Sequence, residues 1–204
     1  MHTKTLAIFL LSTFLCIGCK PSTKKKVQRA KEAITVHIPA DTTKINEAYT
    51  YCKKNKLNTQ VALLVNLTQH SGNYRFFAVN LLNKDTLLRG LVTHGHCQQF
   101  EGRMATFSNQ IGSNCSSEGR YKVGGKYTGM FGTAYKLHGL DSTNCNAFDR
   151  FVVLHSHSCV PDKEQADDIC TSEGCPTISP NFLKSLEPFI DEAKKPLLLW
   201  VYKD

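Results

Sequence analysis

The sequence predicts one mainly β domain with two helices, one at the start and one near the end of its folded part. Short apolar segments of strand length follow one another from residue 60 onward, and turn-forming residues separate them. Helical periodicity is confined to two segments. The chain has 204 residues, which suits one such domain preceded by a targeting segment.

The first predicted helix begins at Asp41 and Thr42. Apolar side chains recur at helical spacing along it, so they share one face that a sheet can cover, and they are Ile45, Ala48, Tyr49 and Cys52. The basic stretch at residues 53–56 ends this helix.

The remaining elements are short strands and one further helix. The turns at 71–73 and 83–85 divide the first strands into an antiparallel meander. The second helix begins at Ser179–Pro180, a capping hydroxyl followed by a proline, and Pro188 can kink it. The predicted strands span residues 60–67, 74–80, 87–93, 120–123, 134–137, 151–155 and 197–202.

The N-terminus predicts export. Lys4 precedes an apolar run from residue 6 to residue 17, which is too short to span a bilayer permanently. Gly18–Cys19 after this run resembles a bacterial lipobox, although Cys16 stands where Leu is usual. We expect a lipoprotein signal peptide over residues 1–18, a basic linker over 19–40 and the folded domain over 41–204. A plain secretory signal with an incidental Cys19 is the alternative.

The net charge of +8 does not predict nucleic-acid binding, because it is concentrated at the N-terminus. Seven positive charges lie in residues 1–31, and residues 33–204 carry only +2. A solvated basic tether fits this distribution. We therefore expect a membrane partner through a lipid on Cys19, at the cell envelope and facing the periplasm, and no nucleic-acid partner.

Cysteine usage agrees with export. Seven of the nine cysteines follow Cys19, and an odd number leaves at least one thiol without an intrachain partner. If Cys175 is that thiol, the other six can form three disulfides in an oxidising compartment. Cys159 and Cys170 bracket one polar loop and are expected to pair. The other pairings stay open among Cys52, Cys97, Cys115 and Cys145.

The candidate active site is the segment from Ser172 to Pro176, which contains Gly174 and Cys175, together with His155 upstream. Glycine permits a tight turn that directs successive backbone N–H groups at one point, where they can stabilise an oxyanion. A neighbouring histidine can take the thiol proton and return it to a leaving amine. Taken alone, this short motif fits a disulfide turn equally well.

The wider pattern resembles the L,D-transpeptidase catalytic-domain family, particularly its exported murein branch. The resemblance runs from about residue 60 to residue 202. It rests on Phe-Ser-Asn at 107–109, on Gly112-Ser113 and Ser116-Ser117-Glu118-Gly119, on 137–140, on Asn146-Ala147 with Arg150 and the strand to His155, and on the motif Ser-x-Gly-Cys-Pro at 172–176.

The resemblance implies a β-sandwich catalytic domain that needs no cofactor. Cys175 is expected to be the nucleophile and His155 the base, with the Ser156 carbonyl orienting the imidazole. The N–H groups of Gly174 and Cys175 are expected to form the oxyanion hole, and Ser172 to buttress the turn. The implied substrate is the peptidoglycan stem tetrapeptide. Loss of terminal D-Ala then gives a 3-3 crosslink, or a tripeptide if water is the acceptor, which is L,D-carboxypeptidase activity.

Three positions depart from the family pattern, namely Thr171, Glu173 and Ser156. A carboxylate beside the nucleophile is expected to raise the thiol pKa. Two further residues are candidates for substrate binding. Arg150 can hold a carboxylate, or else make an ion pair with Asp149 or Asp141. Tyr135, with Tyr121 and Tyr127, can line a peptide groove, although packing is the default for such aromatic residues.

Two other functions compete with the enzyme. A zinc-binding exported protein is one, because His94, His96 and Cys97, and likewise His155, His157 and Cys159, carry zinc-ligating groups. We expect no metal, since the context favours disulfides. The other is a catalytically weak or inactive lipoprotein that binds peptidoglycan. That protein would have an inert or disulfide-bonded Cys175.

Overall fold

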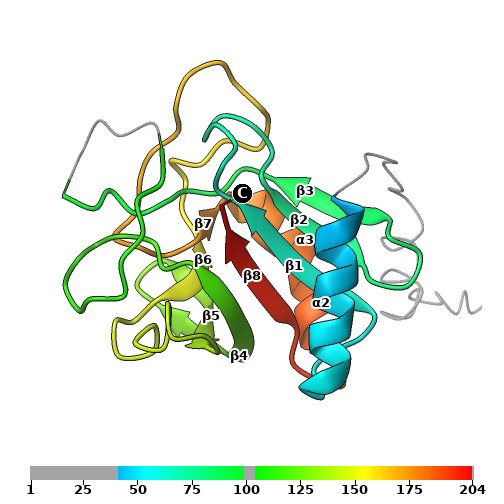
Figure 1. Cartoon of the computed structure of the whole chain (residues 1–204). Helices are drawn as coiled ribbons and strands as arrows, with labels where there is room; N and C mark the ends of the chain where they lie inside the picture. The colour runs from blue at the N-terminus through cyan, green and yellow to red at the C-terminus, as the bar shows by residue number, and fades with distance from the viewer. Residues whose placement is uncertain (1–40, 99–103, 204) are drawn as a thin grey trace, which may run out of the picture.

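A computed structural model describes residues 41–98 and 104–203. The predicted signal peptide, Cys19 and basic linker lie outside these residues. The described elements, in chain order, are α2 (Thr42–Lys54), β1 (Val61–Asn66), β2 (Phe76–Asn80), β3 (Thr86–Gly90), β4 (Gly119–Gly129), β5 (Gly132–Gly139), β6 (Val153–Ser156), β7 (Thr177–Ile178), α3 (Pro180–Asp191) and β8 (Leu198–Tyr202) (Figure 1). The predicted mainly β fold with two helices is confirmed.

The strands form one mixed sheet in the order β3-β2-β1-β8-β4-β5-β6-β7. The predicted antiparallel meander is confirmed as β1, β2 and β3. Two neighbouring pairs are parallel, β1 with β8 and β6 with β7. The last strand in sequence therefore lies in the middle of the sheet, where it joins the meander to the β4–β5 hairpin.

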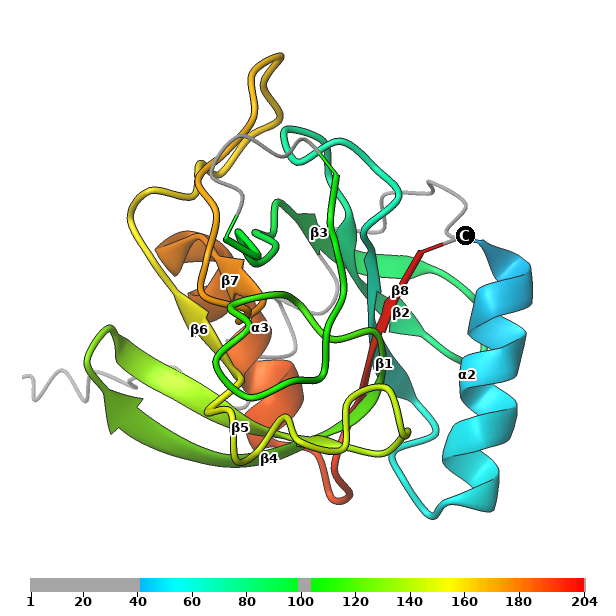
Figure 2. The same cartoon turned by 60° about the vertical axis from the view of Figure 1, so that its left-hand side comes forward.

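The sheet curls until its two edges meet at one end. Val92, just after β3, makes an antiparallel bridge to Ile178 of β7, and the Thr93 N–H donates to the Thr177 carbonyl at 2.9 Å. Helix α3 lies inside the curve (Figure 2) and contributes Phe182, Leu183 and Leu186 to the same apolar core as the surrounding strands. The curled sheet therefore encloses a core as the two sheets of a β-sandwich do, although all its strands belong to one hydrogen-bonded sheet.

Helix α2 covers the other face of the meander. Asp41 caps it by accepting from the Thr43 and Lys44 N–H groups. Side chains alternate between faces along a strand, so Leu63 joins the inner core while Leu64 joins the cluster beneath α2. The predicted apolar face of the helix is confirmed, since Ile45, Ala48 and Cys52 are fully buried there.

Strand lengths near the site differ from the prediction. The β4–β5 hairpin is much longer than the two predicted strands, because glycines and lysines hide the alternation of its outer part. Strand β6 begins at Val153, since Phe151 has φ of +57° and a largely exposed ring. Strand β7 has two residues, too few for a periodic signal. The cap Ser179 and first-turn Pro180 of α3 are confirmed.

Neither α2 nor α3, the helices in the described part of the chain, is long and apolar enough to cross a membrane.

Candidate active site

Strands β6 and β7 bring the predicted nucleophile and base together. Their parallel register pairs His155 with Thr177, two residues after Cys175. The Val153 N–H donates to the Cys175 sulfur at 3.4 Å, so the thiol lies against the strand that carries His155. Cys175 and His155 are twenty residues apart in the sequence, and the β6–β7 pairing brings them close in space. Hydrophobic periodicity does not predict this strand pair.

Gly174 is required at its position for two reasons. Its φ is +109°, which residues with a Cβ rarely adopt. A Cβ built there would also lie 2.6 Å from the Cys115 carbonyl oxygen. Any other residue would therefore displace either the turn or the loop behind it, which explains the glycine directly before the nucleophile.

Ser172 buttresses the turn as predicted. Its hydroxyl donates to the Cys175 carbonyl at 2.7 Å and accepts from the Gly174 N–H at 3.3 Å. Within the described residues the Cys175 N–H donates to no protein group, so it is available to an oxyanion. The Gly174 N–H would have to exchange its bond to Ser172 for one to substrate, and its place in the oxyanion hole stays a prediction.

The segment after β3 fixes the turn from the other side. The Ser172 N–H donates to the His94 carbonyl, and the His96 N–H donates to the Ser172 carbonyl, both at 2.9 Å. The Thr93 hydroxyl donates to the Cys175 carbonyl at 3.2 Å and accepts from the Thr177 N–H at 3.2 Å. Backbone and hydroxyl groups together hold both ends of the nucleophile turn.

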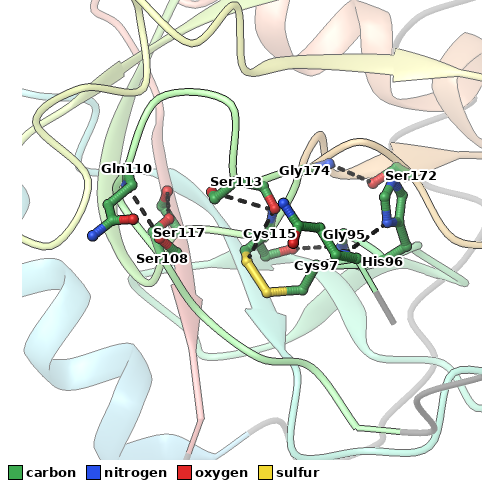
Figure 3. Close-up of a disulfide and its surroundings, with 12 residues drawn as sticks. Gly95, His96, Cys97, Ser108, Gln110, Ser113, Cys115, Ser117, Ser172 and Gly174 are labelled. Atoms are coloured by element: carbon green, nitrogen blue, oxygen red, sulfur yellow. Dashed lines mark hydrogen bonds between the residues drawn. A yellow bond between two sulfur atoms is a disulfide. The ribbon is translucent and has the colours of Figure 1, made fainter. Parts of the chain in front are cut away.

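A disulfide between Cys97 and Cys115 lies directly behind this turn (Figure 3). It joins the segment after β3 to the loop that precedes β4. The same two segments are linked by the Gly95 N–H to Ser116 Oγ at 3.0 Å and by the Cys97 N–H to the Asn114 carbonyl at 3.2 Å. Since the Cys115 carbonyl packs against Gly174, the disulfide supports the surface on which the nucleophile turn rests.

Arg150 supports the same loop. Its two terminal nitrogens donate to the Ser108 carbonyl at 2.7 Å, Ser117 Oγ, Ser113 Oγ at 3.1 Å and the Cys115 carbonyl at 2.7 Å. The ion-pair alternative is wrong, because Asp141 pairs with Arg120 instead. Substrate binding by Arg150 stays a prediction, while the contacts give this residue a positioning role.

The imidazole of His155 is held in one tautomer. Its Nδ1 lies 3.2 Å from the Ser156 carbonyl, which can only accept, so Nδ1 carries the proton. Nε2 is then the basic nitrogen, and it lies 3.0 Å from Thr177 Oγ1. Phe131 at the tip of the β4–β5 hairpin stacks on the ring at 5.2 Å. Burial lowers the pKa of His155 below its usual value near 6.5, which favours the neutral base.

The environment of the Cys175 thiol disfavours the thiolate. Burial raises its pKa above the usual value near 9, and the nearby Glu173 raises it further. The Val153 N–H and the positive charge of Arg150 act in the opposite direction but do not outweigh burial. The expected effect of Glu173 has the predicted sign, although burial is the larger cause. A neutral thiol beside a neutral imidazole therefore describes the resting site.

The substrate-binding role predicted for Tyr135 is wrong. Its ring is 1% exposed in the inner core, and its hydroxyl donates to Asp191 at 2.8 Å. Tyr121 is buried in the same core and donates to the Ser117 carbonyl. Tyr127 is exposed on the hairpin. Tyr135 and Tyr121 therefore pack in the core, as aromatic residues usually do, because the faces of the hairpin that carry them point inward.

The cysteine pairing differs in part from the prediction. The Cys159–Cys170 disulfide is confirmed, and Cys97–Cys115 is the second one. The third possible disulfide does not form, because Cys52 on the buried face of α2 and the exposed Cys145 are both free thiols. The disulfides also remove Cys97 and Cys159 as thiolate ligands from the two proposed zinc clusters. Among the described residues no group of three or more metal-ligating side chains gathers.

Sequence reasoning missed three contacts at the site. Thr177 could have been suspected, since it directly follows the motif and lies two residues after Cys175, a spacing that places side chains on one face of an extended segment. Thr93 and Phe131 carry no local signal. They reach the site through the edge-to-edge closure of the sheet and through the length of the hairpin.

Residues 35–202 match the family described as the L,D-transpeptidase catalytic domain. No curated protein matches the chain. Among solved structures, the chain is similar to the crystal structure of residues 123–326 of the L,D-transpeptidase from Xylanimonas cellulosilytica DSM 15894, with 11% sequence identity, a TM-score of 0.37 and coverage of 75% of this chain and 68% of that chain. Because the family match spans most of the sequence, the chain belongs to the L,D-transpeptidase catalytic-domain family, the peptidoglycan-modifying transpeptidases.

Proposed function

We propose that this protein is a cysteine acyltransferase that uses Cys175 and His155 on peptidoglycan stem tetrapeptides. One observation carries the proposal. The free Cys175 thiol lies on a braced glycine turn directly before β7, and it accepts from the N–H of Val153 in β6, the strand that carries an imidazole of fixed tautomer. Family membership supports peptidoglycan as the substrate.

In the first step, Nε2 of His155 takes the thiol proton and the Cys175 thiolate attacks the carbonyl between the third residue and the terminal D-Ala. The Cys175 N–H stabilises the oxyanion that forms. The C–N bond then breaks, and the imidazolium returns its proton to the amine of the departing D-Ala. A thioester remains on Cys175.

In the second step, an acceptor resolves the thioester. An amine of a neighbouring stem loses a proton to His155, attacks the thioester carbonyl and expels the Cys175 thiolate, which leaves a 3-3 crosslink. Water in place of the amine gives a free carboxylate, the carboxypeptidase outcome. Thr177 must release Nε2 of His155 for either step, since its hydroxyl occupies that nitrogen in the resting site.

We also propose that residues 1–18 are a lipoprotein signal peptide and that Cys19 anchors the protein at the cell envelope, facing the periplasm. The Cys97–Cys115 and Cys159–Cys170 disulfides support an oxidising compartment. Mass spectrometry of the N-terminal peptide from membranes would detect a diacylglyceryl group on Cys19. A signal peptide cleaved elsewhere, with an unmodified Cys19, would contradict the anchor.

The activity is tested with residues 20–204, purified from an oxidising compartment. The protein is incubated with disaccharide-tetrapeptide, and products are read by mass spectrometry beside a Cys175→Ala variant. We expect loss of D-Ala or a crosslinked dimer, absent with the variant. Cys145→Ala is the matched control, because it removes a free thiol outside the site and should leave the products unchanged.

The ratio of dimer to tripeptide gives the preferred acceptor. Absence of any Cys175-dependent product, from folded protein with a titratable Cys175 thiol, would contradict the proposal and favour a peptidoglycan-binding lipoprotein instead.

A further inference from the structure

A second concave site lies at the far end of the β4–β5 hairpin from His155. His155 pairs with Ala134 near the hairpin tip, whereas this site is lined by Lys122 and His138 near its base. The cavity has a volume of about 440 Å³. It lies between the hairpin and the connection from α3 to β8. Figure 2 shows this connection at the bottom of the view.

The rim of this cavity is positively charged. Lys122, Lys194 and Lys195 line it together with His138, and no Asp or Glu in the described part of the chain does. These lysines make no ion pair with any described carboxylate. Glu187 and Asp191 of α3 pair with Lys126 outside the cavity, at 3.0 and 2.7 Å, and Glu192, the C-cap of α3, lines a different cavity. The positive charge of the rim is therefore not neutralised within the described protein.

The backbone of β4 opens toward the same cavity. The register with β5 shifts between Val123 and Lys126, so Gly124 and Gly125 form a bulge. A Cβ at Gly124 would lie 2.7 Å from Nε2 of His138, whereas nothing lies within 4 Å of one at Gly125. Glycine thus lets the imidazole lie over the strand and leaves the main chain open to a close approach.

Packed side chains form part of the lining. His138 stacks on Phe148 at 5.0 Å, and the buried Val123 and Leu197 line the cavity with the lysines. Burial, then Lys122 and Lys136, lower the pKa of His138, as expected in an uncompensated positive field. An anion bound there would reverse this effect.

We propose that this cavity binds a phosphate group, either of a soluble phosphate ester or of a lipid headgroup. A phosphate monoester carries about −1.5 to −2 charges at neutral pH and three acceptor oxygens. As a ligand for several lysines it is therefore better suited than a carboxylate, which carries one charge and two oxygens. Lysine is suited to phosphate as a point charge, and the open glycine bulge admits the oxygens close to the main chain. This binding goes beyond the proposed transpeptidation and uses none of its residues.

The test titrates residues 20–204 with inorganic phosphate and follows the amide and imidazole resonances of Gly124, Gly125 and His138 by NMR, with acetate at equal ionic strength as the carboxylate probe. Phosphatidic acid–phosphatidylcholine vesicles, against phosphatidylcholine alone, test the lipid source by sedimentation, because phosphatidic acid carries a phosphate monoester. Lys194→Gln/Lys195→Gln removes two rim charges. Lys163→Gln/Lys184→Gln removes two exposed charges elsewhere and is the matched control.

We expect saturable shifts with phosphate, binding at least fivefold weaker in Lys194→Gln/Lys195→Gln, and a change below twofold in the control. Sedimentation with phosphatidic acid vesicles that depends on the same lysines would support the lipid source. Binding to inorganic phosphate without such sedimentation would support the soluble source. The proposal would be overturned if the protein showed no saturable shifts and no lysine-dependent sedimentation. It would also be overturned if both double variants weakened binding equally, or if acetate bound as tightly as phosphate.

Discussion

The half of the sheet beneath α2 and the edge that carries Cys175 are held by different interactions. Under α2, side chains such as Ile45 and Leu64 form an apolar cluster against regular strands. At the edge, β7 has two residues, and the nucleophile turn is held by hydroxyls, carbonyls, Arg150 and a disulfide. The first arrangement stabilises the fold, whereas the second fixes the positions of a few reacting atoms. Changes in the two regions should therefore affect different measurements.

The largest loss of activity is expected for Arg150→Ala. Four hydrogen bonds to the loop before β4 are lost, and each bond to a charged group is worth about 1.5–3 kcal/mol. We expect kcat/KM to fall at least about tenfold, and the free energy of unfolding to fall by no less than about 3 kcal/mol. Steady-state kinetics and denaturant unfolding measure both.

Arg150→Lys is the control, because it keeps the charge but not the fork of donors and should recover only part of the activity. A rise in KM alone, with unchanged stability, would instead assign Arg150 to substrate binding and contradict the positioning role.

A change under α2 should have the opposite signature. Ile45→Ala leaves a cavity in the apolar cluster, so the free energy of unfolding should fall by about 2–5 kcal/mol. At a temperature where the variant stays folded, kcat/KM should change less than about twofold. A large loss of kcat/KM in the folded variant would show that the two regions are coupled and would break the comparison.

The two disulfides sharpen the comparison, because they close loops of similar length, with separations of 18 and 11 residues. Removing either as a Cys→Ser pair should cost about 3 kcal/mol of stability by loop-closure entropy. Cys97→Ser/Cys115→Ser should also lower kcat/KM roughly threefold to tenfold, since Cys115 supports Gly174. Cys159→Ser/Cys170→Ser is the matched control, and an equal loss of kcat/KM in both pairs would refute the buttressing role.

The smallest predicted effect is a displacement of the pH profile. Burial lowers the pKa of His155, so the neutral base should persist, and the acidic limb of kcat/KM should fall below pH 6.5. Burial raises the pKa of Cys175, so its alkylation by iodoacetamide should still accelerate above pH 9. An alkylation rate that levels off well below pH 9 would indicate an activated thiolate and contradict the neutral resting site.

The sequence predicted secondary structure well where buried side chains recur at a regular spacing. The face of α2 and the strands β1, β2 and β8 follow from helical or compact apolar patterns, and their predicted bounds lie within a few residues of those observed. The sequence was less informative along the β4–β5 hairpin, because polar and glycine residues on both sides of the bulge break the alternation.

Within the site, the sequence predicted Ser172, Gly174 and Cys175 from one short motif, and it predicted His155 with them through the wider resemblance to the family. The environment of Arg150 and Tyr135 could not be predicted in the same way. Both side chains are polar and suited to substrate, and only the packing of the loop before β4 and of the hairpin decides that they face the protein. The Cys97–Cys115 disulfide likewise depends on the closure of the sheet edges.

The most direct test of the account is intact mass spectrometry of the protein quenched by acid during turnover with the tetrapeptide. We predict an added mass equal to the stem fragment without its terminal D-Ala, mapped to Cys175 after digestion and sensitive to hydroxylamine as a thioester. Product formation with the adduct on another residue, or with Cys175 unmodified and replaceable by Ala, would contradict Cys175 as the nucleophile.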